Sequence, residues 1–175
     1  MPNVRHQSQS DAAYRAGSFA FAMALVAILT ALAFEHLGGL VPCQLCLEQR
    51  CAFYIGIPAL FVALVLVASD QPKLAALLFF AVSLGFLANA GFGVYHAGVE
   101  WKFWPGPDTC SPVPGELKPL GRALIDRLES ARIVRCDEAS WRFLGLSFAG
   151  WNVVASFLIF IAALQAAFAA STRIR

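Results

Sequence analysis

Long apolar runs, rather than alternating apolar and polar positions, dominate the chain. Four runs contain no charged residue, and each is long enough to cross a bilayer, because a helix needs roughly 20 residues to span about 30 Å of hydrocarbon. These runs are residues 16–34, 51–69, 74–95 and 143–170. The pattern therefore predicts an all-α membrane protein that crosses the bilayer four times.

Three polar segments join the runs and define the expected topology. Residues 70–73 read "DQPK" and are so short that the second and third spans must form an antiparallel hairpin. Residues 35–50 form a short loop and residues 96–142 a long one, and both must lie on the face opposite the two termini. We therefore expect one domain, a four-helix transmembrane bundle with a short and a long loop on the same side.

The long loop divides into two parts of different character. Its first part, "EWKFWPGPDTCSPVPG", holds four prolines and is expected to be irregular around Cys110. In its second part, leucines recur at helical spacing opposite charged residues, which predicts a short amphipathic helix lying at the membrane interface. These leucines are Leu117, Leu120, Leu124 and Leu128.

The first apolar run has one feature of a secretory signal peptide. The sequence from Ala31 to Ala33 resembles an A-x-A cleavage site, and Arg15 precedes the run. The apolar core of a signal peptide is about 7–15 residues long, and this run is longer. We therefore expect the segment to remain in the protein as its first span.

Composition agrees with a membrane protein and argues against a nucleic-acid partner. Hydrophobic residues make up 59% of the chain and charged residues only 14%, whereas soluble domains average about 25% charged residues. The net charge is only +2, and no basic block is present. The lipid bilayer is thus an expected partner, and no nucleic acid is expected.

All five cysteines fall on or beside the loop face, which indicates the orientation. They are Cys43, Cys46, Cys51, Cys110 and Cys136. The distribution of Lys and Arg favours cytoplasmic termini only weakly, but cysteines gather where the compartment is oxidising. We therefore expect periplasmic loops and cytoplasmic termini.

The segment "PCQLCLEQR" carries the clearest candidate chemistry. Pro42 suits the first position of a helix, and Cys43, Cys46 and Arg50 then lie within a sector of about 60° on one helix face. A helix N-terminus and a guanidinium one turn away both favour a thiolate at Cys46. Arg50 could also donate hydrogen bonds to an anionic or carbonyl ligand. The alternative is that Arg50 reaches for lipid headgroups beside an inert disulfide.

Two other interpretations of the cysteines stay open at this point. Cys43 and Cys46, with His36 or His96, could bind a soft metal in a metal-handling protein, but a structural zinc site usually has two close pairs of ligands. Alternatively, the disulfides could only staple loops. No metal is expected, and Cys51 is expected to be a buried small apolar residue.

Four segments together resemble one family. They are "PCQLCLEQR", the histidine-containing "YHAGVEWKFWPGP", "DTC" and "RCDEASWRFLGLSFAGWN". Over about residues 15–165, the chain resembles DsbB, the bacterial inner-membrane quinone reductase that reoxidises the periplasmic thiol oxidase DsbA. The resemblance implies a thiol:quinone oxidoreductase that sustains disulfide bond formation, with ubiquinone or menaquinone as cofactor and a DsbA-like thioredoxin-fold protein as partner.

The resemblance also implies roles for individual residues. Cys43 and Cys46 would be the quinone-side redox pair, and Arg50, Cys46 and His96 would contact the quinone. Cys110 would form the mixed disulfide with the DsbA-like partner, and Cys136 would pair with Cys110. These assignments come from the family and not from spacing alone.

Overall fold

The computed structural model describes residues 2–40, 42–107, 139 and 141–172. Within them, four long helices form the protein: α1 (Pro2–His36), α2 (Gln44–Ala68), α3 (Pro72–Glu100) and α5 (Phe148–Thr172). All four are long and apolar enough to cross a membrane. The prediction of an all-α protein with four spans is confirmed. Cys110, Cys136 and the expected amphipathic helix lie outside the described residues.

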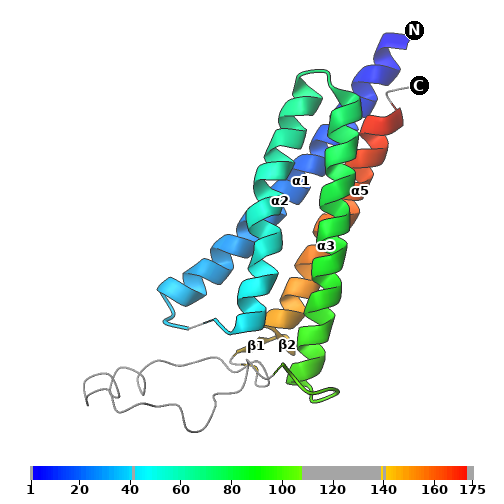
Figure 1. Ribbon diagram of the computed structural model, residues 1–175. Helices are drawn as coiled ribbons and strands as arrows, with labels where there is room; N and C mark the ends of the chain where they lie inside the picture. The colour runs from blue at the N-terminus through cyan, green and yellow to red at the C-terminus, as the bar shows by residue number, and fades with distance from the viewer. Residues whose placement is uncertain (1, 41, 108–138, 140, 173–175) are drawn as a thin grey trace, which may run out of the picture.

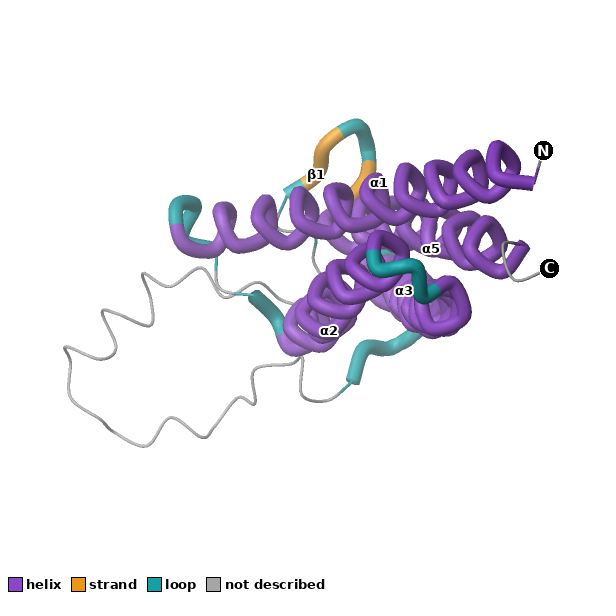
Figure 2. Tube along the Cα trace, turned by 90° about the horizontal axis from the view of Figure 1, so that it is seen from above, coloured by secondary structure: helices purple, strands orange, loops and turns teal. Residues whose placement is uncertain are grey.

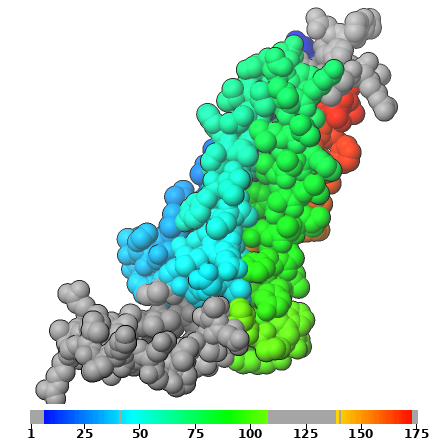
Figure 3. Space-filling model, in the orientation of Figure 1, coloured from blue at the N-terminus to red at the C-terminus, as the bar shows by residue number. Residues whose placement is uncertain are grey.

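The helices form a bundle in which each one packs on two neighbours. α1 packs on α2 and α5, and α3 packs on the same two helices. Figure 1 shows both termini and the α2–α3 connection at one end, with the α1–α2 connection and the strands at the other. On the face shown in Figure 3, α2 and α3 lie side by side along their length. This arrangement is the expected four-helix topology.

Several helix boundaries differ from those predicted. α1 begins at Pro2, well ahead of the uncharged run that starts at residue 16, and α2 begins at Gln44, two residues after the Pro42 start that the cysteine segment predicts. The predicted bounds followed the uncharged runs, whereas a helix continues through polar residues wherever its ends leave the hydrocarbon. Hydropathy therefore locates the membrane part of each helix and not its ends.

A small β-hairpin, which the sequence analysis did not predict, precedes α5. Strand β1 (Arg142–Phe143) pairs antiparallel with β2 (Leu146–Ser147). The two residues between them, Leu144 and Gly145, have φ values of 52° and 82°, as a tight two-residue turn requires. The fourth helix consequently begins at Phe148 rather than at residue 143.

Small residues bring α1 and α5 close together in the core. The buried alanines of the two helices are Ala13, Ala20, Ala24, Ala149, Ala162, Ala163, Ala166, Ala167 and Ala170. Small side chains allow helix backbones to approach closely in a membrane, where packing rather than water exclusion holds helices together. Between α2 and α3 the core is aromatic: Phe53 packs edge-on against Phe86, with ring centroids 5.2 Å apart.

Close packing of α2 on α3 should make Gly56 sensitive to substitution. A Cβ at Gly56 would lie 2.6 Å from the ring of Phe86, which is fully buried against Phe53 and has little room to move. We predict that Gly56→Ala lowers the free energy of unfolding by about 1–3 kcal/mol. Gly85→Ala on α3 is the control, because nothing lies within 4 Å of its Cβ. Thermal unfolding in detergent, followed by loss of helicity, measures both; equal midpoints would contradict this packing.

Candidate functional site

Cys43 begins the site by capping helix α2. It is the N-cap residue, with φ −74° and ψ 168°, and its Sγ accepts a hydrogen bond of 3.3 Å from the backbone N–H of Cys46. Ser, Thr or Asp usually occupy this position and satisfy the same free N–H group. Pro42 therefore lies outside the helix, rather than in its first turn as predicted. The cap fixes the Cys43 sulfur above the first turn of α2.

The two sulfur atoms of the segment lie together. Cys43 Sγ and Cys46 Sγ are 2.8 Å apart, with Cys43 buried and Cys46 half-buried. The hydrogen bond from the Cys46 thiol is the largest influence on Cys43 and lowers its pKa; burial opposes this, and hydrogen bonds from His96 and the Cys46 N–H lower it further, to about 5. The pair is therefore placed to close as a disulfide and, when open, to hold a thiolate on Cys43. The sequence pattern alone predicts the thiolate on Cys46, beside Arg50, and this stays a prediction.

His96 approaches the pair from helix α3. Its side chain is buried, and its Nε2 lies 3.8 Å from Cys43 Sγ and 4.0 Å from Glu100 Oε1. On its other side, Nδ1 accepts a hydrogen bond of 3.1 Å from the Gln49 amide. The structure thus brings His96 to the redox pair, on the Cys43 side.

A largely apolar cavity of about 420 Å³ opens on the other side of the pair, between α1, α2 and α5. We call it the α1–α2–α5 cavity. Its described lining residues are Met23, Val26, Ala27, Ile28, Thr30, Ala31, Phe34, Glu35, Leu40, Pro42, Cys46, Gln49, Arg50, Phe53, Trp141, Phe143, Phe148, Ala149, Trp151, Asn152 and Ala155. Cys46 and Arg50 belong to this lining, whereas Cys43 and His96 do not. The two cysteines therefore face different surroundings.

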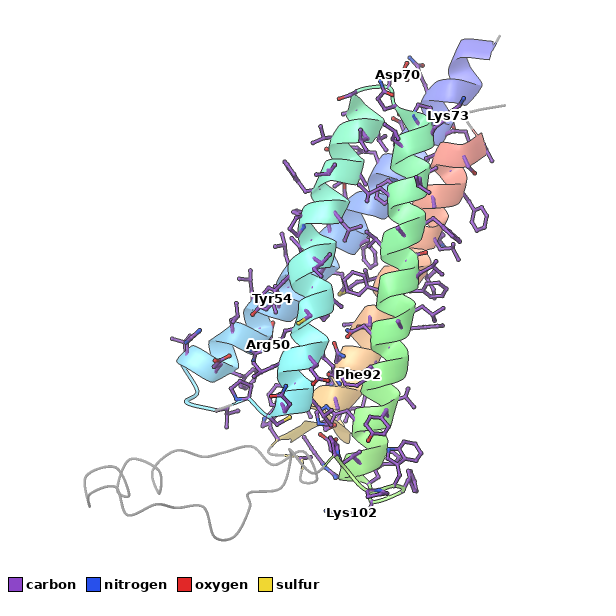
Figure 4. All side chains as sticks on the ribbon, viewed as in Figure 1. Arg50, Tyr54, Asp70, Lys73, Phe92 and Lys102 are labelled. Carbon is purple, nitrogen blue, oxygen red and sulfur yellow. The ribbon has the colours of Figure 1, made fainter. Side chains whose placement is uncertain are left out.

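Arg50 meets a carboxylate across the cavity. Its guanidinium forms an ion pair with Glu35 of α1, and both side chains are largely buried, with 12% and 27% of their surfaces exposed. Figure 4 shows Arg50 on the part of α2 where α1 and α2 diverge. The pair keeps the guanidinium at the cavity wall, close enough to Cys46 to act on it electrostatically.

Amides that face one another inside the bundle, two of them buried (Gln49 and Asn89) and one half-buried (Asn152), form a second polar group that the sequence analysis missed. Asn152 of α5 donates a hydrogen bond of 3.0 Å to Gln49 Oε1, and Asn89 of α3 donates one of 2.9 Å to Ser156. An amide within an apolar span needs a partner inside the protein. The sequence does show Asn89 and Asn152 as polar residues within uncharged runs, which indicates that each needs a partner. It does not show which residues those partners are.

Cys51 corrects one expectation. It is exposed on α2 rather than buried, and its Sγ donates to the Leu47 carbonyl at 3.7 Å. At 100° per residue, Cys51 lies about 140° around the helix from Cys46, so it faces away from the cavity. It therefore takes no part in the site.

A soft metal fits this site less well than a disulfide does. The donor atoms of Cys43, Cys46 and His96 all lie within 4.8 Å of one another. Of the two histidines that could complete a metal site, His96 is therefore the one that lies beside both cysteines. Two sulfurs bound tetrahedrally at about 2.3 Å from zinc would stand roughly 3.8 Å apart, well beyond the 2.8 Å observed. A metal bound at Nε2 would also require the imidazole proton on Nδ1, which faces the NH₂ group of Gln49 at 3.1 Å.

Comparisons with known proteins agree on one family. The family model described as "Disulfide bond formation protein DsbB" matches residues 14–166. Proteins named "Disulfide bond formation protein B" are similar: that of Stutzerimonas stutzeri (strain A1501) is 31% identical over 77% of this chain and 82% of its own. That of Methylococcus capsulatus (strain ATCC 33009 / NCIMB 11132 / Bath) is 34% identical over 78% and 81%. No solved structure matches the chain.

The surroundings of Cys43 predict its behaviour with pH. Because the pKa of Cys43 is lowered from 9.0 to about 5, the reduced pair should carry a thiolate at neutral pH and lose it as the pH falls through about 5. The ultraviolet absorbance of the thiolate measures this in a full-length protein whose other cysteines, Cys51, Cys110 and Cys136, are alanine. Alkylation followed by peptide mass spectrometry assigns the thiolate. A midpoint near 9, or alkylation mainly at Cys46, would contradict the geometry.

Proposed function

Because the chain belongs to the DsbB family of disulfide bond formation proteins, it is a disulfide-generating oxidoreductase, and we propose that it reoxidises a DsbA-like thiol oxidase and passes the electrons to a membrane quinone. It is a multi-pass membrane protein. We place it in the bacterial inner membrane with both termini cytoplasmic. The observation that carries the proposal is a pair of cysteines with one sulfur on an apolar cavity.

The cavity has the chemistry that a quinone headgroup needs. Its volume of about 420 Å³ lies within the range of small-molecule sites, and its walls are mainly aliphatic and aromatic. Its polar groups are few: Arg50, Gln49 and Asn152 could donate hydrogen bonds to a quinone carbonyl, and Cys46 lies beside them. When bound, ubiquinone or menaquinone would supply an acceptor for two electrons and two protons. The residues present fit either one.

Electrons would reach the pair by two thiol–disulfide exchanges. The dithiol of the partner would open a Cys110–Cys136 disulfide through a mixed disulfide at Cys110, and the partner's own disulfide would form. The Cys110–Cys136 dithiol would then open the Cys43–Cys46 disulfide in the same way. Each exchange moves two electrons and two protons and leaves the number of disulfides unchanged. Closing Cys43–Cys46 again releases two electrons and two protons toward the cavity.

The two sulfurs of the pair are suited to different tasks. Cys46 lines the α1–α2–α5 cavity, so it is the sulfur from which electrons would leave. Cys43 is not part of that lining, so it is the sulfur that a loop cysteine would attack, and this exchange would leave the Cys46 thiolate on the cavity. The family assigns the quinone contact to Cys46 and also to His96. Here His96 is better placed to act on Cys43.

Arg50 would orient the acceptor at the cavity wall. Glu35 holds the guanidinium through part of its fork, and the remaining N–H groups can donate elsewhere, since arginine has five. The carboxylate also offsets the cost of carrying a positive charge into an apolar site. The ion pair thus fixes the position of Arg50 and leaves some of its N–H groups able to donate to a ligand.

A metal-handling role is the second candidate, favoured by the proximity of Cys43, Cys46 and His96. The oxidoreductase has the better support because the metal reading leaves the cavity and Arg50 without a role. Bound metal that persists through purification, with no quinone dependence of thiol oxidation, would favour the second candidate.

Thiol oxidation in purified protein tests the proposed function. A reduced DsbA-like protein should be oxidised catalytically only when a ubiquinone or menaquinone analogue is added. Cys136→Ser should trap a mixed disulfide through Cys110, because the resolving thiol is gone, and Cys110→Ser should trap none. Turnover without quinone would overturn the proposal, and a complex trapped through Cys136 in Cys110→Ser would reverse the two loop roles.

Replacing Arg50 tests its part in this activity. A charge-assisted hydrogen bond is worth about 1.5–3 kcal/mol, so Arg50→Met should reduce the rate at limiting quinone by about 10- to 150-fold. Arg50→Lys keeps the charge but loses the planar fork and should fall between Arg50→Met and the parent. Lys73→Met, at the opposite end of the bundle, is the control. An Arg50→Met protein with the parent's quinone dependence would show that Arg50 only anchors the helix.

A further inference from the structure

The amides of Asn89, Asn152 and Gln49 form a chain of hydrogen bonds with a single direction. Asn152 Oδ1 accepts from Asn89 Nδ2 and from Ser156 Oγ, each at 3.4 Å. Asn152 Nδ2 then donates to Gln49 Oε1 at 3.0 Å, and Gln49 Nε2 donates to His96 Nδ1 at 3.1 Å. The chain crosses from α5 to α2 to α3 and ends on the histidine beside Cys43.

Each link in this chain fixes the next. Because the oxygen of Asn152 faces two donors, its NH₂ group must face Gln49. The oxygen of Gln49 is thereby engaged, so its own NH₂ group faces the imidazole. An amide NH₂ can only donate, so His96 Nδ1 must accept, and the proton of the neutral imidazole resides on Nε2. The reverse direction would require the amides to turn over together.

The proton on Nε2 points toward the redox pair. Cys43 Sγ lies 3.8 Å from this nitrogen, and Glu100 Oε1 lies 4.0 Å from it. Glu100 Oε2 is buried and has no hydrogen-bond partner among the described residues. The other charged or titratable groups that act on these atoms are Cys46 and Arg142. An N–H donor at Nε2 therefore serves two acceptors, one of them the sulfur that becomes a thiolate.

We infer that Gln49 and Asn152 are positioning residues that hold His96 in the Nε2–H tautomer, so that the histidine donates a hydrogen bond to the Cys43 sulfur. The inference rests on the proposed function in that it takes Cys43 as half of the exchanging pair. With the opposite tautomer, a nitrogen lone pair would face the sulfur, and repulsion would disfavour the thiolate. The amides thus act on Cys43 through His96, without touching it.

Nitrogen-15 NMR of the imidazole ring reads the tautomer directly in the full-length reduced protein, with His96→Gln used to assign the signals. The parent should show the Nε2–H form. Asn152→Asp replaces the donor with a group of the same shape that, ionised, only accepts. Gln49 should then turn its NH₂ to the aspartate and its oxygen to His96, which converts the imidazole to the Nδ1–H form.

Gln49→Met provides a second variant in case Asn152→Asp does not fold. It removes the donor to Nδ1 and should give a mixture of tautomers. Gln44→Met is the matched control, because Gln44 is an exposed amide on the same helix that bonds only Glu48 among the described residues, at 3.2 Å. This control should leave His96 in the Nε2–H form.

Titration of Cys43 then measures how the tautomer of His96 affects the thiolate. In full-length proteins that keep Cys43 as the only cysteine, Asn152→Asp and Gln49→Met should raise its thiolate midpoint by about one pH unit, the worth of one hydrogen bond. The control should not move it. The inference fails if the parent shows the Nδ1–H form, if both variants keep the parent tautomer, or if the tautomer changes while the Cys43 midpoint does not. Neither quinone nor partner protein enters these measurements, so they stand apart from a failure of the turnover assay.

Discussion

A polar group carried into a bilayer must find its partner within the protein, and this constraint organises the end of the bundle that holds the cysteine pair. Arg50 is paired with Glu35, and the amide of Asn152 is paired with Gln49. Water is not available in hydrocarbon to replace a missing partner, so each of these contacts ties two helices together. The polar residues that a redox site requires are therefore also the contacts that fix its geometry.

The same constraint gives the two cysteines different neighbours although they are one helical turn apart. Capping of α2 holds the Cys43 sulfur toward α3, within 3.8 Å of His96 Nε2, while Cys46 lies on the wall shared with Arg50. Exchange with a loop cysteine and delivery of electrons to a hydrophobic acceptor need different surroundings. Gln49 and Asn152 lie on the cavity wall and also lead to His96, so they connect the two sides.

The sequence predicts those parts of the structure that depend on local pattern. Uncharged runs located four spans, and helical spacing correctly placed Cys46 and Arg50 on one wall. Contacts between residues far apart in the sequence produce no local pattern and could not be predicted. Glu35 was assigned only to a loop, and no pattern connects Gln49 with Asn152. Cys51 was misjudged because burial depends on which helix face meets a neighbour. The hairpin before α5 was missed because its strands have only two residues each and lie within or beside an apolar run.

The central claim is that the cavity beside Cys46 is where a quinone accepts electrons from the pair. Photo-crosslinking with an azido-quinone, followed by peptide mass spectrometry, tests it most directly. The account predicts adducts on the cavity walls, within residues 23–35 of α1, 46–53 of α2 and 148–155 of α5. Competition by unlabelled quinone should abolish them, and Arg50→Met should weaken them. Adducts confined to the outward faces of α2 and α3, unaffected by competitor, would contradict the account.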